Sequence, residues 1–212
     1  MTALRIEIVS DVVCPWCFLG TRRLEQALAL PPAVDATVTY RPFLLDPSTP
    51  VSGADLRARL QAKFGDPEVM FLRVEAAAHA SGIPLDFAKV QRYPSTVAAQ
   101  TLLRHALPRG TQRALADALF TAYFLDGRDI GEVETLAAIA TFHGFTAREA
   151  SAVCGDESEL AATRAEAARM TTRGIAGVPF TIVGGRVAVA GAQPIATYRR
   201  AIEKALGRPP AP

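Results

Sequence analysis

Two cysteines separated by a proline and a tryptophan, Cys14-Pro15-Trp16-Cys17, limit the fold of this chain more than any other feature. The run before them, Leu4 to Val9, alternates apolar and charged residues, as a β-strand does. The run after them, Phe18 to Leu30, has helical character. The sequence therefore predicts a strand-to-helix junction with the first thiol at the amino end of the helix. Pro15 suits the first helical position, because the N–H that it lacks would be unpaired there.

A thiol at the start of a helix has a chemical consequence. Unpaired N–H groups and the helix dipole stabilise negative charge at that end. We expect this to lower the pKa of the Cys14 thiol and to make its thiolate available near neutral pH. Cys17 lies within reach to resolve a mixed disulfide formed at Cys14. The pair therefore predicts redox chemistry by thiol–disulfide exchange.

A CxxC pair also occurs in zinc sites and among structural cysteines. Tetrahedral zinc needs more ligands than one such pair supplies, and the chain offers only Cys154 and three scattered histidines, His79, His105 and His143. None of them forms a second CxxC or an HxxxH pattern, so the sequence predicts no metal site. Free cysteine is commonly a small buried hydrophobe. We interpret Cys154 in this way, with a second redox or regulatory thiol as the alternative.

Composition limits which partners and which cellular compartment can be expected for this chain. Half of the 212 residues are apolar, enough for a sizeable core, and the net charge is +2 with both signs interspersed. No basic block or aromatic–basic stripe indicates nucleic-acid binding. Arg5, Glu7 and Asp11 interrupt the apolar stretch that a signal peptide needs, and no run approaches the ~18 apolar residues of a membrane span. We therefore expect a cytoplasmic protein without a membrane partner, in which a CxxC is typical of catalysis or redox sensing.

The two ends of the chain have β-type patterns. Val34 to Leu45 predicts a second strand, which completes a βαβ unit with the first strand and its helix. Near the other end, Phe180 to Val183 and Arg186 to Ala190 predict a hairpin turning at Gly184-Gly185. A last helix is expected from Pro194 to Leu206.

The middle of the chain, from about Asp55 to Arg173, is helical in pattern and is cut by glycine and proline. Asp156 and Glu159 resemble a capping pair for a helix that ends before Gly174. A core-forming stripe stands at helical spacing in one of the predicted helices and consists of Ala114, Leu115, Ala118, Leu119, Ala122 and Tyr123.

Gly177-Val178-Pro179 stands immediately before the late hairpin. Only X-Pro bonds form the cis isomer at modest cost. A cis proline beside the dithiol would leave the backbone N–H and C=O of Val178 free to pair with an extended peptide or with glutathione. We therefore expect a cis Val178–Pro179 bond that lies against Cys14.

Several longer segments together resemble one known family. The chain is similar to DsbA-like thiol–disulfide oxidoreductases, and within them to the FrnE-like branch related to 2-hydroxychromene-2-carboxylate isomerase. The resemblance extends over nearly the whole chain. The matching segments are Ser10 to Gly20, Tyr40 to Pro47, Ala122 to Phe124 with Gly127 to Ile130, Gly174 to Phe180, and Gly191 to Pro194.

The resemblance implies an α/β thioredoxin fold with a large all-helical insertion. The thioredoxin-like domain would be discontinuous, 1–45 and 176–212, with the insertion at 46–175. Cys14 would attack and Cys17 resolve, with Pro15 and Trp16 between them. Pro179 would be the cis proline facing the dithiol, and Val178 would present its backbone to the substrate.

The same resemblance implies the partners. The substrate would be a disulfide or a dithiol, either a protein or a small molecule. No tightly bound cofactor is expected, and glutathione would serve as a redox partner or cosubstrate. The redox direction, the natural substrate and the oligomeric state do not follow from the sequence.

Alternatives remain open at this point. Isomerases and kappa-class glutathione transferases share the scaffold but typically have serine in place of the first cysteine, so the retained Cys14 favours redox chemistry. A noncatalytic redox sensor is a third class. Trp16 either tunes or shields the dithiol, offers an apolar patch to a partner, or fills space. Ser95 and Gln100 stand where the family often has asparagine and histidine, which indicates a different pocket if those residues shape it.

Overall fold

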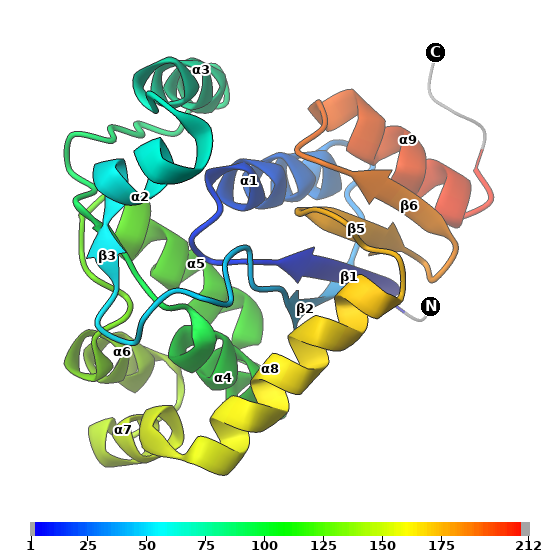
Figure 1. The fold of residues 1–212 in the computed structure, drawn as a ribbon. Coiled ribbons are helices and arrows are strands. Elements are labelled where there is room, and N and C mark those ends of the chain that lie inside the picture. The colour runs from blue at the N-terminus through cyan, green and yellow to red at the C-terminus, as the bar shows by residue number, and fades with distance from the viewer. Residues whose placement is uncertain (1–2, 209–212) are drawn as a thin grey trace.

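The computed structural model describes residues 3–208 and contains a four-stranded mixed sheet in the order β2-β1-β5-β6 (Figure 1). The central strand β1 (Leu4–Ser10) pairs in parallel with β2 (Ala36–Pro42) and antiparallel with β5 (Phe180–Val183). The hairpin partner β6 (Val187–Ala190) completes the sheet. Strands from the two ends of the chain therefore form one sheet, as expected for a thioredoxin fold that is interrupted in sequence.

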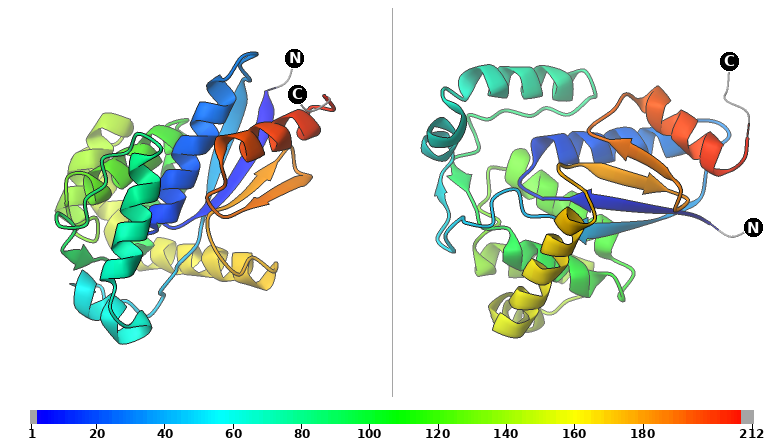
Figure 2. Two further views of the ribbon diagram at one scale, coloured as in Figure 1. Left: turned by 90° about the horizontal axis from the view of Figure 1, so that it is seen from above. Right: turned by 45° about the vertical axis from the view of Figure 1, so that its right-hand side comes forward.

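Helices cover the two faces of this sheet unequally. α1 (Pro15–Ala29) and α9 (Ile195–Ala205) pack against each other over one face, where Leu4, Ile6 and Ile8 of β1 are buried (Figure 2). The opposite face receives α8 (Glu157–Thr172), whose Met170 belongs to the same buried apolar cluster as Val9. β1 thus follows the two-residue alternation of a strand that is covered on both faces near its carboxyl end.

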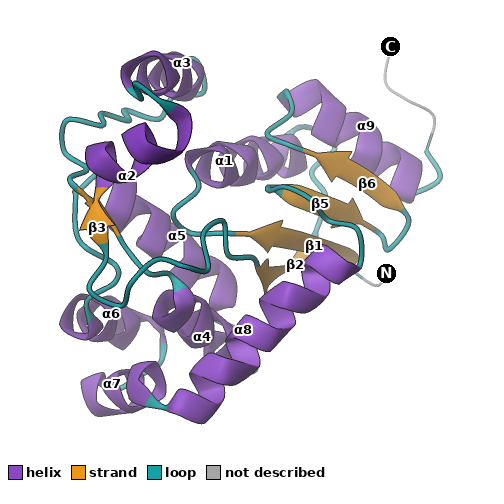
Figure 3. Cartoon of the chain, in the orientation of Figure 1, coloured by secondary structure: helices purple, strands orange, loops and turns teal. Residues whose placement is uncertain are grey.

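The segment between β2 and β5 is mainly helical (Figure 3). Its remaining helices are α2 (Leu56–Phe64), α3 (Glu68–His79), α4 (Val97–Ala106), α5 (Gln112–Phe124), α6 (Val133–Ala140) and α7 (Ala147–Gly155), with a 3₁₀ turn at Thr141–His143. Asp156 caps α8, as predicted, by accepting hydrogen bonds from the N–H groups of Ser158 and Glu159. The Glu159 side chain does not complete the predicted capping pair and instead contacts Arg104 and His105. The same cluster of buried apolar residues includes members from this segment and from the sheet, and the division into 1–45 with 176–212 and 46–175 stays a prediction.

Two local features differ from the sequence-based expectation. A small antiparallel pair, β3 (Ala54–Asp55) and β4 (Arg92–Tyr93), interrupts the predicted helical segment, because strands of two residues are too short to give a periodic signal. The strand predicted to reach Leu45 ends at Pro42. Beyond it, the Leu45 N–H donates to the buried Asp11 carboxylate at 2.8 Å, which draws the chain away from the sheet.

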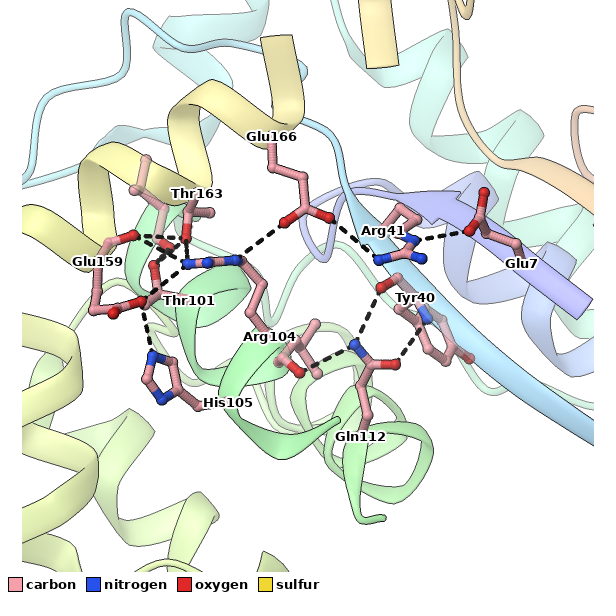
Figure 4. Close-up of polar contacts among 12 residues, drawn as sticks. Glu7, Tyr40, Arg41, Thr101, Arg104, His105, Gln112, Glu159, Thr163 and Glu166 are labelled. Atoms are coloured by element: carbon pink, nitrogen blue, oxygen red, sulfur yellow. Dashed lines mark hydrogen bonds and ion pairs between the residues drawn. The ribbon is translucent and has the colours of Figure 1, made fainter. Parts of the chain in front are cut away.

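A chain of ion pairs connects the sheet with the helices (Figure 4). Arg41 of β2 contacts Glu7 of β1 at 2.8 Å and Glu166 of α8 at 3.5 Å. Arg104 of α4 contacts the same Glu166 at 3.1 Å and Glu159 at 3.2 Å. Two helices and two strands thus share one alternating set of charges.

A second polar contact in Figure 4 joins α5 to β2. The Tyr40 N–H donates to the side-chain oxygen of Gln112 at 2.9 Å, and the Gln112 amide donates to the Tyr40 carbonyl at 3.1 Å. Gln112 is 3% exposed and also donates to the Leu103 carbonyl. Buried backbone groups of β2 are therefore satisfied by a side chain.

Candidate active site

Cys14 lies in the short loop that leads from β1 into α1. It is the N-cap residue of α1, with φ −89° and ψ 114°, and Pro15 is the first helical residue, as predicted. The Cys14 carbonyl accepts the N–H groups of Cys17 and Phe18 at 3.0 and 3.2 Å. In Figure 1 this loop lies at the end of the sheet that faces the inserted helices. The Cys14 thiol is thus at the amino end of a helix, where developing negative charge is stabilised.

The two thiols of the pair differ in their surroundings. Both are free in this structure. Cys17 is fully buried, and this burial, together with the neighbouring Cys14 thiol, raises its pKa well above the ordinary value. Cys14 lines a pocket and Cys17 does not. A reagent in the pocket therefore meets Cys14 first.

The Val178–Pro179 peptide is cis, as expected, and it lies beside the dithiol. The Val178 carbonyl oxygen is 3.9 Å from the Cys14 sulfur, which donates to it. Gly20 in α1 allows this approach: a Cβ atom at Gly20 would lie 2.9 Å from the Pro179 ring and 3.0 Å from the Tyr198 hydroxyl. A glycine in the second turn of the helix therefore allows the proline loop to lie close to the pair.

Asp11 is a buried acid beside the dithiol that the sequence reasoning missed. It is 1% exposed, and burial raises its pKa to about 6, although hydrogen bonds from the Leu45 and Val13 backbone and from Thr96 and Gln100 lower it. An acid between two apolar valine-containing runs, three residues before a cysteine, is the signal that would have identified it. Its carboxylate connects the loop of the dithiol to the segment that follows β2.

The positions at which the chain departs from the family pattern do not line the pocket. Gln100 is 2% exposed, and its amide donates to the carbonyls of Ser10 at 2.9 Å and Phe43 at 3.4 Å. Ser95 is half-buried. The departure at Gln100 therefore affects the support behind the dithiol loop rather than the wall of the pocket.

The pocket beside Cys14 has a volume of about 250 Å³. Trp16 forms part of its wall and is half-buried, with the Arg73 guanidinium 6.0 Å from the centre of its ring. The rest of the lining is mostly apolar and comes from the dithiol loop, the inserted helices and the proline loop: Val13, Pro15, Leu45, Leu56, Leu60, Phe64, Met70, Phe71, Val74, Phe87, Tyr93, Tyr123, Phe124 and Val178. Helices α2 and α3 thus cover a cavity that Cys14, the predicted nucleophile, also lines.

The third cysteine and the histidines lie away from this arrangement. Cys154 is in α7, and burial raises its pKa to about 12. His79 pairs with the Leu85 carbonyl and His105 with Glu159, and none of the three histidines lines the pocket. Within residues 3–208, no three His, Cys, Asp or Glu side chains gather as metal ligands would. None of the helices described there is long and apolar enough to cross a membrane.

Comparison with known proteins supports one family. The family model described as the DSBA-like thioredoxin domain matches residues 5–203. The structure is similar to that of a probable DsbA oxidoreductase from Streptomyces coelicolor, with a TM-score of 0.86 and 32% identity over 99% of this chain and 93% of that one. Among curated proteins, the uncharacterized protein YwbO of Bacillus subtilis is 26% identical over 140 residues. That match covers 65% of this chain and 64% of the length of YwbO.

Two more distant structures share the fold. The cytosolic disulfide reductase DsbM of Pseudomonas aeruginosa, solved with GSH, has a TM-score of 0.67 and 23% identity, covering 96% of this chain and 100% of that chain. A 2-hydroxychromene-2-carboxylate isomerase has a TM-score of 0.66 and 15% identity, covering 96% of this chain and 94% of that chain. Both redox and isomerase proteins therefore use this architecture.

Proposed function

The chain belongs to the DSBA-like thioredoxin domain family, and from this membership we propose that it is a dithiol–disulfide oxidoreductase acting through Cys14 and Cys17. The observation that carries the proposal is the unequal placement of the two thiols. Cys14 stands at a helix amino end and opens on a pocket, whereas Cys17 is fully buried behind it. An accessible attacking thiol and a protected resolving thiol are what the exchange reaction needs.

The reaction proceeds in two displacements. The Cys14 thiolate attacks one sulfur of the substrate disulfide, which forms a mixed disulfide and releases the other sulfur as a thiolate. Cys17 then loses its proton and attacks the Cys14 sulfur, so that a Cys14–Cys17 disulfide forms and the second substrate thiolate leaves. The substrate gains two electrons and the protein loses two. The reverse sequence oxidises a dithiol substrate.

The proline loop has a separate role in this proposal. The Val178 carbonyl already lies beside the Cys14 sulfur. Backbone groups at this position are suited to pair with the extended chain on either side of a substrate cysteine, as in strand addition. Val178 and Pro179 are therefore proposed to bind the substrate, while Pro15 and Trp16 shape the dithiol loop.

The proposal also includes the compartment and the redox partner. We propose a cytoplasmic location and glutathione as the redox partner, with no tightly bound cofactor. The fold shared with a cytosolic disulfide reductase solved with GSH supports both points. In a glutathione-buffered compartment the direction of exchange depends on the potential of the Cys14–Cys17 couple.

A redox titration of the Cys14–Cys17 couple against glutathione, combined with turnover of an insulin disulfide, tests the proposal. We expect a reversible two-electron titration and catalytic turnover that both require Cys14. A reversible titration without turnover of any disulfide would instead indicate a noncatalytic redox sensor.

A glutathione-dependent isomerase or transferase is the second candidate, because the apolar pocket beside Cys14 suits a small organic substrate. Isomerisation of a double bond that requires added glutathione and survives Cys14→Ala would select this candidate. Loss of all activity in Cys14→Ala, with turnover of disulfides by the unmodified protein, would exclude it.

A further inference from the structure

The pocket beside Cys14 continues into a second, more polar hollow. The two cavities share Asp46, Arg59 and Lys63, and the second adds Ser48 and Ala62. The inner part is lined by aromatic and aliphatic side chains, so its floor is apolar and its mouth is charged. A ligand that fills both parts must itself be amphipathic.

The charges at the mouth do not cancel. Arg59 is paired with Asp46 at 2.6 Å, so those two charges neutralise each other. Lys63 is exposed and has no carboxylate partner within residues 3–208; its ammonium lies 5.5 Å from the centre of the Phe64 ring. Arg73, which stacks over Trp16, likewise pairs with no carboxylate in that part of the chain. Among the charged residues that line the two cavities, Asp46 and Arg59 neutralise each other, so Lys63 leaves a net positive charge that attracts an anion.

The size of the inner part limits what enters it. A cavity of ~150 Å³ lined by apolar side chains holds a benzene ring, and this pocket is larger, at about 250 Å³. It suits a substituted ring or one large apolar side chain. Because Cys14 lines the same pocket, the ring-sized group must stand next to the sulfur that Cys14 attacks.

We propose that this site selects disulfides that carry a ring-sized apolar group beside the reacting sulfur and an acidic group that pairs with Lys63. This inference rests on the proposed disulfide exchange and specifies its substrate class. Cys14 attacks the sulfur that bears the ring, the partner sulfur leaves as a thiolate, and Cys17 then releases the ring-bearing thiol as the internal disulfide forms. The same chemistry is available from a small aromatic thiol acid or from a peptide cysteine beside an aromatic and an acidic residue.

The test is a single turnover of the reduced protein without external reductant, in a Cys154→Ser background so that two thiols react. The small-molecule probes are 5,5′-dithiobis(2-nitrobenzoic acid), the uncharged 2,2′-dithiodipyridine and the cationic, ring-free cystamine. The peptide probes are the disulfide dimers of acetyl-Phe-Cys-Glu-amide and acetyl-Ser-Cys-Gln-amide. Rates of different variants are compared on the same probe, so that the intrinsic reactivity of the probe does not affect the ratio.

Lys63→Ala should slow oxidation by dithiobis(nitrobenzoate) about two- to fivefold, the range expected for an exposed ion pair, and leave the rate with dithiodipyridine unchanged. Lys204→Ala, on α9, is the matched control and should change neither rate. Met70→Trp places a larger side chain in the pocket and should slow both ring-bearing probes but not cystamine. A similar loss of rate with the Phe-Cys-Glu dimer identifies a peptide source. A loss of rate with dithiobis(nitrobenzoate) alone identifies a small-molecule source.

Equal rates for Lys63→Ala and the parent protein on every acidic probe would overturn the inference. The inference would also be overturned if Met70→Trp lost the same fraction of its oxidation rate with cystamine as with the ring-bearing probes. Circular dichroism shows whether this variant is folded. If the parent protein forms no Cys14–Cys17 disulfide with any probe, the proposed function itself fails.

Discussion

Cys14 and Cys154 have the same exposed fraction, 4% each, but they lie at opposite ends of their helices. Cys14 caps the amino end of α1, beside the Val178 carbonyl and a pocket. Cys154 is the second-last residue of α7, and burial alone accounts for its raised pKa. The exposed fraction therefore does not distinguish the cysteine proposed to react from the one proposed to be inert; the helix end, the neighbouring polar groups and access to a cavity do.

The largest difference between these two regions is expected in catalysis. Cys14→Ala should lower the rate of disulfide turnover by at least about a thousandfold, because it removes the nucleophile of the first displacement and the sulfur that Cys17 attacks in the second. Cys17→Ala should accumulate a mixed disulfide through Cys14, measured by mass spectrometry of the acid-quenched protein. Comparable trapping in Cys14→Ala would reverse the roles of the two residues.

Alkylation at several pH values tests the expected difference in reactivity between Cys14 and Cys154. With a pKa of about 12, Cys154 has a thiolate fraction at pH 7 of about one in 10⁵, roughly three thousandfold below that of an ordinary thiol. Iodoacetamide followed by peptide mapping should therefore modify Cys14 first and leave Cys154 protected in the folded protein. Modification of Cys17 before Cys14 at acidic pH would contradict the proposed assignment.

A buried acid gives the Cys14 region a pH-dependent stability. Between the ordinary pKa of 3.8 and the folded value of about 6, folded Asp11 retains a proton that the unfolded chain has lost, so the free energy of unfolding falls as pH rises across this interval. The full effect is roughly 3 kcal/mol. Asp11→Asn should remove this slope and, after the loss of about one hydrogen bond, raise the free energy of unfolding at pH 7 by about 1–2 kcal/mol.

Urea unfolding at several pH values measures the effect of Asp11→Asn as a difference from the parent protein. Other carboxylates contribute equally to both proteins, so their contributions cancel in this difference. One of them is Asp156, which acts in the opposite direction because hydrogen bonds from Ser158 and Glu159 lower its pKa. If the free energies of unfolding of the two proteins change in parallel with pH, Asp11 is not the group that causes the pH dependence.

The smallest effect is expected at α7. Cys154→Ser should leave disulfide turnover within about twofold of the parent protein and lower the free energy of unfolding by about 1 kcal/mol, because it places a hydroxyl in an apolar site. A loss of turnover at unchanged stability would show that Cys154 relays thiols and would remove the contrast between the two regions.

The features that the sequence predicted well are local ones. The start of α1 at Pro15 and the cap of α8 at Asp156 depend on neighbouring residues, and both are confirmed. The stripe in α5 was right at Leu115 and Leu119 but wrong at Ala114, which is exposed, because helical spacing does not say where the neighbouring elements lie.

The features that the sequence did not predict depend on distant residues. The Asp11–Leu45 hydrogen bond spans 34 residues, and the β3–β4 pair joins Asp55 to Arg92. The pocket likewise forms only when α2 and α3 pack over the dithiol loop. Cys14 and Cys17 could therefore be proposed as the reacting pair from sequence, whereas the charge pattern beside them could not.

The Gln112 amide has a consequence for solubility. β2 is an edge strand, and the free N–H and C=O groups of an edge are a template for pairing with another chain. By binding both backbone groups of Tyr40, the Gln112 side chain acts as a one-residue substitute for a neighbouring strand. Intermolecular β-pairing along this edge would have to displace a buried amide, so this contact protects β2 against aggregation through strand addition.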